Sequence, residues 1–203
     1  MKENIGIDFD NTIVNYDNLI ADIAKMLYSP LPKNISNKND IKQFIIKKYS
    51  EKKWTALQGL IYGPLINGAK INSNFKKFVS MFNKSHNIFI ISHKTKESFC
   101  SHKFRLRESA INFLKFHDFL NIKSPHSIPL KNIFFESTIE KKIKRIEKLK
   151  CDYFIDDMNL ILDNIKNKNL IKIKFDKQNN FFKLSKNNYS INNWNKIINI
   201  IKN

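Results

Sequence analysis

Residues 5–12 read Ile-Gly-Ile-Asp-Phe-Asp-Asn-Thr, an apolar run that ends in the polar residues Asp8, Asp10 and Thr12. The apolar part predicts a buried strand. Carboxylates are a poor continuation of such a strand, because an unpaired charge in apolar surroundings carries a cost of several kcal/mol or more. A bound cation would remove that cost and the repulsion between the two carboxylates, and hard divalent cations prefer oxygen ligands. The stretch therefore predicts a metal-dependent site at the carboxyl end of a strand.

The length and composition of the chain are those of a globular protein. Its 203 residues make one domain, or one domain with a lid, and 42% of them are apolar. No apolar run is long enough to span a bilayer, and the first strand begins too early to leave room for a signal peptide. Cys100 and Cys151 lack the spacing of a metal motif, so we expect two free thiols in a reducing cytoplasm.

The formal net charge of +18 raises the question of a nucleic-acid partner. Nucleic-acid sites usually draw on arginine as well as lysine, and only Arg105, Arg107 and Arg145 are arginines. The chain is also rich in Asn and Ile, which together with Lys indicates AT-rich codons. We therefore favour a solvated lysine surface over a nucleic-acid groove and expect no nucleic-acid or membrane partner. A positive field still favours a small anionic substrate.

Short apolar runs alternate with helical periodicity along the chain. Strands are predicted at residues 4–9, 87–91, 132–135, 152–155 and 170–175. Helices are predicted at residues 16–28, 73–84, 106–120, 138–150 and 190–202. This alternation predicts an α/β protein whose parallel sheet is covered by helices on both faces.

The segment between the first two strands, roughly eighty residues, is far longer than one crossover helix needs. Residues 29–40 are rich in Pro, Asn, Ser and Lys and predict a loop, whereas residues 41–62 predict helix. We expect residues 15–72 to form an inserted helical cap. Residues 1–14 and 73–203 would then form the α/β core.

Polar side chains also follow two later strands. One strand runs into Ser92, and another runs into Asp156 and Asp157. In an open parallel sheet, ligands bind beyond the carboxyl ends of the strands. If these strands are neighbours, we expect their polar ends to lie along the same edge as Asp8 and Asp10.

These residues resemble the motifs of the haloacid dehalogenase (HAD) superfamily. The first motif, Asp-x-Asp-x-Thr after an apolar strand, matches Asp8, Asp10 and Thr12. The second, a strand ending in Ser or Thr, matches Ser92. The fourth, a strand ending in acidic residues, matches Asp156 and Asp157, and the lysine motif ahead of it matches Lys142 or Lys141. The resemblance implies a Rossmann-like three-layer sandwich with a cap inserted after the first strand.

The resemblance also implies a reaction. Asp8 would attack phosphorus and form an aspartyl-phosphate, as some enzyme carboxylates do. Asp10 would protonate the leaving alcohol and then activate the water that hydrolyses the intermediate. Dehalogenases of the superfamily lack this second Asp, so its presence favours phosphoryl transfer to water.

The remaining motif residues would bind the metal and the phosphate. Mg²⁺ would be held by Asp8, the backbone carbonyl of Asp10, Asp156 and Asp157, the last either directly or through water. The phosphate would be bound by Ser92, by the backbone N–H of His93 and by a lysine. We prefer Lys142 to Lys141 for that role, because it precedes the apolar Ile143 near the predicted helix start.

Trp54, Gln58 and Tyr62 are spaced by four residues in the predicted cap and so share one helical face. We favour packing of this face on neighbouring structure and keep contact with the substrate as the alternative. Arg107 is a second candidate for substrate contact, with a surface role equally open. The segment 54–63 resembles a group of small HAD proteins found with bacterial surface-polysaccharide genes.

Our main hypothesis is a Mg²⁺-dependent phosphoric monoester hydrolase acting on a small phosphorylated metabolite. A phosphorylated sugar or a small phosphorylated alcohol made for a surface glycan is the expected substrate class. Two alternatives remain open at this point. One is a nucleotidase or nucleic-acid end phosphatase, and the other is a non-catalytic phosphate-binding protein.

Overall fold

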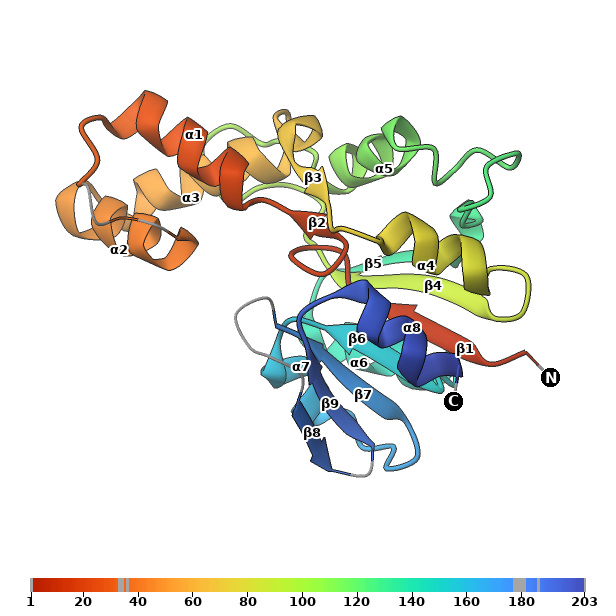
Figure 1. The fold of residues 1–203 in the computed structure, drawn as a ribbon. Coiled ribbons are helices and arrows are strands. Elements are labelled where there is room, and N and C mark those ends of the chain that lie inside the picture. The colour runs from red at the N-terminus through yellow and green to blue at the C-terminus, as the bar shows by residue number, and fades with distance from the viewer. Residues whose placement is uncertain (1, 33–34, 36, 177–181, 186, 203) are drawn as a thin grey trace. The chain divides into compact units, whose positions relative to one another are not determined.

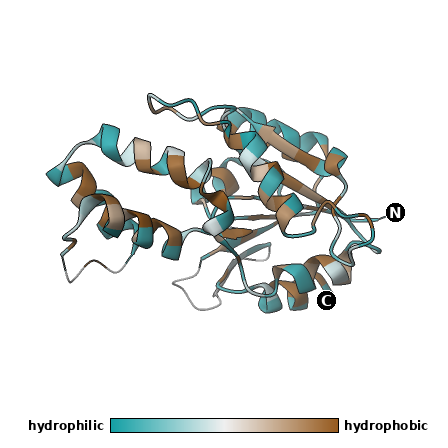
Figure 2. Cartoon of the chain, turned by 90° about the horizontal axis from the view of Figure 1, so that it is seen from above, coloured by the Kyte–Doolittle hydropathy of each residue, from teal (hydrophilic) through white to brown (hydrophobic). Residues whose placement is uncertain are grey.

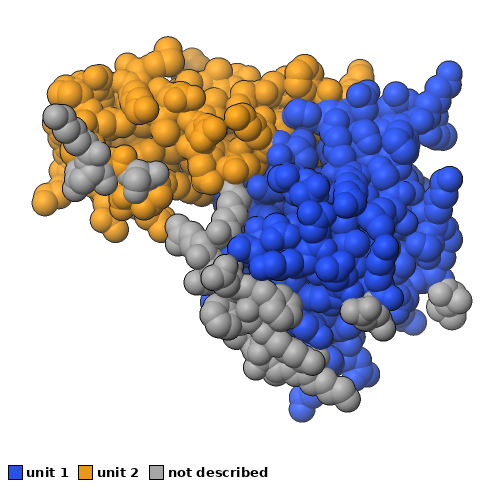
Figure 3. All heavy atoms as spheres, in the orientation of Figure 1, with its two compact units in different colours: residues 1–14, 71–94, 117–203 blue, residues 15–70, 95–116 orange. Residues whose placement is uncertain are grey.

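A computed structural model of the chain describes residues 2–32, 35, 37–176 and 187–202, and the backbone of residues 182–185. The chain divides into two compact units (Figure 3). Unit 1 comprises Met1–Val14, Ile71–Lys94 and His117–Asn203, and unit 2 comprises Asn15–Lys70 and Thr95–Phe116. Most of the expected cap thus falls in unit 2. Residues 95–116, which we expected in the core, belong to unit 2 as well.

Over the described residues, unit 1 is built on a seven-stranded sheet of order β5-β4-β1-β6-β7-β9-β8 (Figure 1). Its strands are β1 (Asn4–Ile7), β4 (Asn87–His93), β5 (Ile133–Glu136), β6 (Tyr153–Asp156), β7 (Ile171–Phe175), β8 (Phe182–Ser185) and β9 (Asn188–Ile191). All neighbouring pairs are parallel except β8 and β9, which are antiparallel. The five predicted strands are confirmed, whereas β8 and β9 were not predicted.

Helices cover both faces of this sheet. The helices of unit 1 are α4 (Phe75–Phe82), α6 (Ile139–Lys148), α7 (Asn159–Asn164) and α8 (Trp194–Lys202), with a 3-10 turn η2 (Leu130–Asn132). Helices α6 and α7 contact each other and strands β4 to β7, while α4 and α8 contact each other and strands β4 and β9. The predicted three-layer α/β fold is confirmed. Of these helices, α7 was not predicted.

Apolar side chains fill both layers between helices and sheet. On the α4 and α8 side, the Trp194 ring lies 4.7 Å from Phe75 and 4.8 Å from Phe78, centroid to centroid. On the other side, Ile146 and Phe154 belong to a fully buried cluster. Figure 2 shows the corresponding pattern, in which helices carry hydrophobic residues on one side and hydrophilic residues on the other. Burial of this kind is the main stabilising contribution to the fold.

Gly6 explains how β1 fits in the middle of the sheet. A Cβ atom at this position would lie 2.6 Å from the Phe154 ring and 3.0 Å from the Cys151 sulfur. Those distances are too short for any side chain, so only glycine lets the ring of Phe154 pack across β1. The close approach fixes the strand that leads into Asp8.

Unit 2 is helical. It contains α1 (Asp17–Tyr28), α2 (Lys38–Lys48), α3 (Glu51–Tyr62), a 3-10 turn η1 (Ile66–Gly68) and α5 (Leu106–Phe116). The helical structure predicted for 41–62 is confirmed as two helices, because the helix ends at Lys48 and a new one begins after Ser50. The Ser50 hydroxyl accepts a hydrogen bond from the Lys53 N–H and so caps the start of α3.

The packing of α3 explains why residues 95–116 belong to unit 2. A Cβ atom on Gly59 would lie 2.7 Å from the Cys100 sulfur, and one on Gly63 would lie 2.9 Å from Phe104. Helix α3 therefore lies directly against the segment 98–104, which leads into α5. Two short strands, β2 (Val14–Asn15) and β3 (Lys70–Ile71), pair with each other where the chain leaves unit 1 and returns to it. Over the described residues, no helix combines the length and apolar character of a membrane span.

Candidate active site

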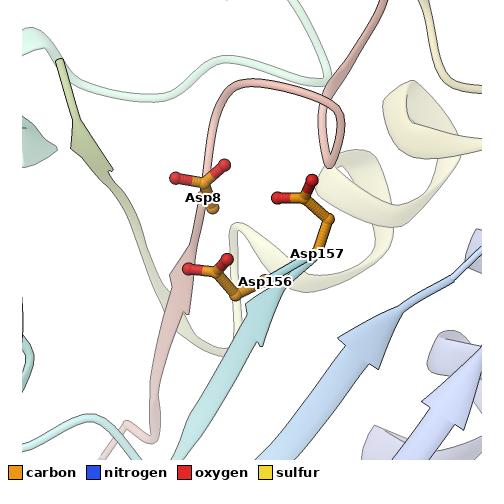
Figure 4. A group of neighbouring side chains, drawn as sticks. All are labelled: Asp8, Asp156 and Asp157. Carbon is orange, nitrogen blue, oxygen red and sulfur yellow. The ribbon is translucent and has the colours of Figure 1, made fainter. Parts of the chain in front are cut away.

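Three carboxylates meet at the carboxyl ends of β1 and β6. The Asp8 N–H donates to the Ile155 carbonyl at 2.9 Å, so Asp8 extends the pairing of these strands. Ile7 of β1 is in register with Ile155 of β6, so the residues that follow them, Asp8 and Asp156, point to the same face of the sheet. Ligand oxygens of Asp8, Asp156 and Asp157 all lie within 4.8 Å of one another. Figure 4 shows the three carboxylates gathered at this edge.

Lys142 connects two of these carboxylates from helix α6. Its Nζ donates to Asp8 Oδ1 at 2.5 Å and to Asp156 Oδ2 at 2.6 Å, and the residue is 1% exposed. The lysine lies three residues after Ile139 and four before Ile146, so it occupies the sheet-facing side of α6. Helix α6 thus has a cationic residue on the side that packs against the sheet, where an apolar residue is expected.

The charges of this group are strongly perturbed. Burial raises the pKa of Asp8 to about 7, although the nearby Lys142 ammonium acts in the opposite direction. Burial likewise raises the pKa of Asp156. Burial alone would lower the pKa of Lys142, but the carboxylates of Asp8 and Asp156 outweigh it and raise that pKa. Three carboxylates against one ammonium leave two formal negative charges, which a divalent cation would balance.

Asp157 is oriented by the loop that follows β1. Asn11 Nδ2 donates to Asp157 Oδ2 at 3.2 Å, and Met158 N–H donates to the neighbouring Asp156 Oδ1 at 2.9 Å. Asn11 has a φ of 61°, in the left-handed region that asparagine tolerates better than most residues. The unusual backbone of Asn11 therefore places an amide donor beside an acidic side chain.

Asn72 also forms hydrogen bonds with the loop that follows β1. Its Nδ2 donates to the Thr12 carbonyl at 2.7 Å, and its backbone N–H donates to the Ile13 carbonyl at 2.8 Å. Asn72 is 7% exposed, so these bonds lie in a buried setting where an unpaired carbonyl would be costly. The residue fixes the path of the chain just after Asp8 and Asp10.

Asp10 has a different partner from the other carboxylates. Its carboxylate pairs with the Lys94 ammonium at 2.9 Å. Among the described residues, the side-chain oxygens of Asp10 are not part of the three-carboxylate group. The two aspartates of the first motif are thus held by two different lysines.

Ser92 lies at the end of β4, beside β1. It is 1% exposed, and among the described residues its Oγ has no hydrogen-bond partner. A buried hydroxyl without a partner is uncommon in native proteins, because the lost hydrogen bond with water is not replaced. The hydroxyl is therefore available to a bound ligand.

Several solved structures described as HAD hydrolases share this fold. A HAD-superfamily hydrolase of subfamily IA, variant 1, from Geobacter sulfurreducens has a TM-score of 0.59 and 11% identity, over 98% of this chain and 96% of that chain. YfnB from Bacillus subtilis, described as a HAD hydrolase and solved bound to magnesium, has a TM-score of 0.59 and 10% identity, over 100% and 99% of the two chains. A HAD hydrolase of family IA, variant 3, from Entamoeba histolytica has a TM-score of 0.54 and 15% identity, over 99% and 100%.

The chain has the HAD fold. At these identities the likeness extends to the fold alone. No protein-family model matches the sequence, and no curated protein sequence is significantly similar to it.

Within this HAD fold, the expected site residues of unit 1 fall into three places. Asp8, Asp156, Asp157 and Lys142 lie together, Asp10 pairs with Lys94, and Ser92 is buried at the end of β4. Lys141 is exposed, so the structure favours Lys142 of the two lysines as the buried cation. The His93 side chain is exposed, and its Nε2 lies 3.2 Å from the Ser137 carbonyl. The roles of these residues stay predictions.

The expected substrate residues of the cap lie in unit 2. Trp54 is 4% exposed and faces the interior, which fits the packing role favoured from the sequence and leaves little surface for a substrate. Gln58 and Arg107 are half-buried. The Tyr62 hydroxyl accepts a hydrogen bond from Lys38 Nζ at 3.1 Å, and its ring lies edge-on to Tyr16 at 4.8 Å.

Three residues of the site were not singled out from the sequence. Of the three, only Lys94 could have been expected from the sequence, because it lies two residues after Ser92 at the end of the same predicted strand. Asn11 stands between the two motif carboxylates and Thr12, but nothing in its type predicts the positive φ. Asn72 is sixty residues away in sequence from Thr12, which it contacts, so only the fold reveals it.

Proposed function

We propose that the protein is a Mg²⁺-dependent phosphatase of small phosphate monoesters. The observation that carries the proposal is the buried Asp8, bridged to Asp156 by Lys142, beside Asp157 on a HAD fold. Asp10, two residues further, is held separately by Lys94. In this arrangement, Asp8 would be the carboxylate that attacks and Asp10 the one that moves a proton.

The acidic group fits a hard divalent cation. Three carboxylates with oxygens within 4.8 Å of one another offer the oxygen donors that Mg²⁺ prefers, and their excess negative charge calls for a cation. YfnB, which has the same fold, was solved with magnesium. Asp8, Asp156 and Asp157, with the Asp10 backbone carbonyl, would hold the ion. When bound, it would offset the repulsion between Asp8 and the phosphate dianion and neutralise charge that develops during transfer.

The reaction proceeds in two displacements at phosphorus. In the first, an oxygen of Asp8 forms a bond to phosphorus, the bond from phosphorus to the ester oxygen breaks, and that oxygen takes a proton from Asp10. In the second, water gives a proton to Asp10, attacks the same phosphorus and releases inorganic phosphate from Asp8. Lys142 and the Ser92 hydroxyl donate hydrogen bonds to the phosphoryl oxygens.

The substrate class follows from charge and from the sequence resemblance. The net charge of +18 favours an anionic ligand, and segment 54–63 resembles HAD proteins found with surface-polysaccharide genes. A phosphorylated sugar or small phosphorylated alcohol is the substrate class that we propose. We propose that the reaction belongs to the biosynthesis of a surface polysaccharide. We also propose that the protein acts in the cytoplasm.

Hydrolysis of 4-nitrophenyl phosphate by the purified protein with Mg²⁺ tests the reaction class. We expect turnover that EDTA abolishes and that Asp8→Asn reduces by at least about a thousandfold, because the attacking oxygen is lost. Mass spectrometry of the acid-quenched protein would locate the phosphoryl group on the peptide containing Asp8. Turnover by Asp8→Asn at a level near the wild type would contradict the aspartyl-phosphate route.

A panel of phosphorylated metabolites then tests the substrate class. We expect the highest kcat/KM among phosphorylated sugars and small alcohols. The high positive charge also motivates a nucleotidase or nucleic-acid end phosphatase, so the panel includes nucleotides and a 5′-phosphorylated oligonucleotide. Strongly salt-dependent oligonucleotide binding with preferred turnover of that substrate would replace the metabolite hypothesis. Absence of metal-dependent hydrolysis across the whole panel would favour a non-catalytic phosphate-binding protein.

A further inference from the structure

We propose that Lys94 is the positioning residue for Asp10, and that it holds the Asp10 carboxylate in the orientation needed for proton transfer to the leaving group. This inference rests on the proposed phosphatase reaction and assigns a role in it to a lysine outside the motifs that carry the family resemblance. It differs from the role of Lys142, which contacts Asp8 and Asp156.

The backbone of Lys94 is fixed by the sheet. Lys94 directly follows β4, whose last residue His93 is in register with Glu136 of β5. The Lys94 N–H donates to the Glu136 carbonyl at 2.8 Å and so continues the parallel ladder by one residue. The start of the lysine side chain is therefore held by a rigid element and not by a loop.

The ammonium of Lys94 contacts both oxygens of Asp10. Nζ lies 3.1 Å from Oδ1 and 2.9 Å from Oδ2. The same Nζ lies 5.4 Å from the centre of the Phe9 ring, within the range of a cation–π interaction. A cation that straddles two oxygens restricts rotation of the carboxylate, and the Phe9 ring restricts the cation in turn.

The exposure of the two side chains is unequal. The Lys94 side chain is 3% exposed, whereas the Asp10 side chain is 23% exposed. A ligand can therefore reach Asp10 while the ammonium behind it stays covered. This geometry fits a lysine that acts through Asp10 better than a lysine that binds the phosphate itself.

The role has a specific kinetic consequence. When the ester bond breaks, a poor leaving group needs the proton of Asp10, whereas a stable phenolate such as 4-nitrophenolate leaves without it. Displacement of Asp10 should therefore slow the first step for phenyl phosphate more than for 4-nitrophenyl phosphate. The two esters have nearly the same shape, so a change in binding would affect both alike.

The experiment compares Lys94→Met, Asp10→Asn and the double variant on both esters with saturating Mg²⁺. We expect Lys94→Met to lower kcat/KM for phenyl phosphate about tenfold more than for 4-nitrophenyl phosphate, a part of the roughly hundredfold or larger contribution of a general acid, because Asp10 is displaced but still present. In the Asp10→Asn background, the same substitution should leave the ratio of the two kcat/KM values unchanged. Lys141→Met, which removes an exposed lysine charge from α6, is the matched control and should not alter that ratio.

A second readout does not depend on activity. A buried, ion-paired ammonium exchanges its protons slowly, so metal-free protein labelled with ¹⁵N-lysine should show an NMR signal that Lys94→Met removes. We expect Asp10→Asn to shift or abolish that signal, and Lys141→Met to leave it in place. A signal that does not respond to Asp10→Asn would overturn the pairing.

The outcomes separate this inference from the proposed function. If the wild type hydrolyses neither these esters nor any member of the metabolite panel, the phosphatase proposal fails, and the role of Lys94 fails with it. If the wild type is active but Lys94→Met lowers kcat/KM equally for both esters, the positioning role is overturned and the phosphatase proposal stands. The positioning role would also be overturned if Lys94→Met changed the ratio of the two kcat/KM values in the Asp10→Asn background.

Discussion

Asn11 donates a hydrogen bond to Asp157, from Nδ2 to Oδ2 at 3.2 Å, across 146 residues of sequence. The bond joins the loop after β1 to the end of β6. It therefore connects the two strand ends that carry the acidic group. Partners that orient a metal ligand typically contribute a factor of about 10 to 100 in metal affinity. We therefore expect Asn11→Gly to weaken Mg²⁺ binding by about tenfold, measured by calorimetric titration.

Glycine is the appropriate substitution because it keeps the positive φ of Asn11 without strain. Asn11→Ala is the companion variant. It also removes the amide, but its Cβ adds about 1–2 kcal/mol of backbone strain, which should appear as a lower free energy of unfolding. Unchanged Mg²⁺ affinity in both variants would show that the Asn11 amide is not needed to orient Asp157.

Lys142→Met should destabilise the metal-free protein. The change leaves Asp8 and Asp156 buried near each other without the ammonium that now contacts both. Removing one partner of a buried ion pair costs about 3–5 kcal/mol, and we expect a loss of that size in urea unfolding. Added Mg²⁺ should restore part of it. The neighbouring exposed Lys141→Met should change the free energy of unfolding by no more than about 0.5 kcal/mol.

A Lys142→Met protein as stable as the wild type without metal would contradict this account. It would mean that the two carboxylates are neutral or solvated in the absence of the lysine. Measuring both variants with and without EDTA separates the contribution of the lysine from that of the metal.

The sequence predicts the sheet of this protein well for a physical reason. Strands buried on both faces must be almost wholly apolar, so runs such as 87–91 and 152–155 are conspicuous, and the polar residues that end them mark the site edge. Strand β9, which lies between β7 and the edge strand β8, was not predicted because Asn188–Ile191 mixes polar and apolar residues. Helix α7 was missed because six residues are too few to establish a period.

The division of the chain was harder to predict than its sheet. Residues 95–116 join unit 2 because Gly59 and Gly63 allow α3 to lie against 98–104, and a close backbone approach leaves no periodic signal. The spacing of Ile139 and Ile146 also indicates Lys142 over Lys141, since these isoleucines define the buried side of α6 and Lys142 shares it. The pairing of Lys94 with Asp10 depends on tertiary structure, because 84 residues separate them.

The two thiols should differ in reactivity. Cys151 is 2% exposed, and burial, with a smaller contribution from Asp152, raises the pKa of its thiol to about 12. The thiolate is the reactive form, so Cys151 should be inert to alkylation in the folded protein at pH 8. Cys100 is half-buried and should be the one that is labelled. Peptide mapping after iodoacetamide treatment measures both, and Cys100→Ser should abolish labelling until urea is added.

Stabilisation by Mg²⁺ should increase with pH. Burial raises the pKa of Asp8 from its ordinary value of 3.8 to about 7, so between about pH 4 and pH 7 the folded metal-free chain holds a proton that the unfolded chain has released. The contribution of Asp8 to the free energy of unfolding therefore falls as the pH rises through this range. Above pH 7 the buried carboxylate is charged, and a cation no longer has to displace a proton to bind it.

The measurement is the shift in Tm caused by Mg²⁺ at pH 6, 7 and 8. We expect the shift to be smallest at pH 6 and largest at pH 8. Asp8→Asn is the control, because its amide does not titrate, and its shift should be smaller and depend less on pH than that of the wild type. An equal shift at pH 6 and pH 8 in the wild type would show that Asp8 is already ionised at pH 6, and that Lys142 outweighs burial in setting its charge.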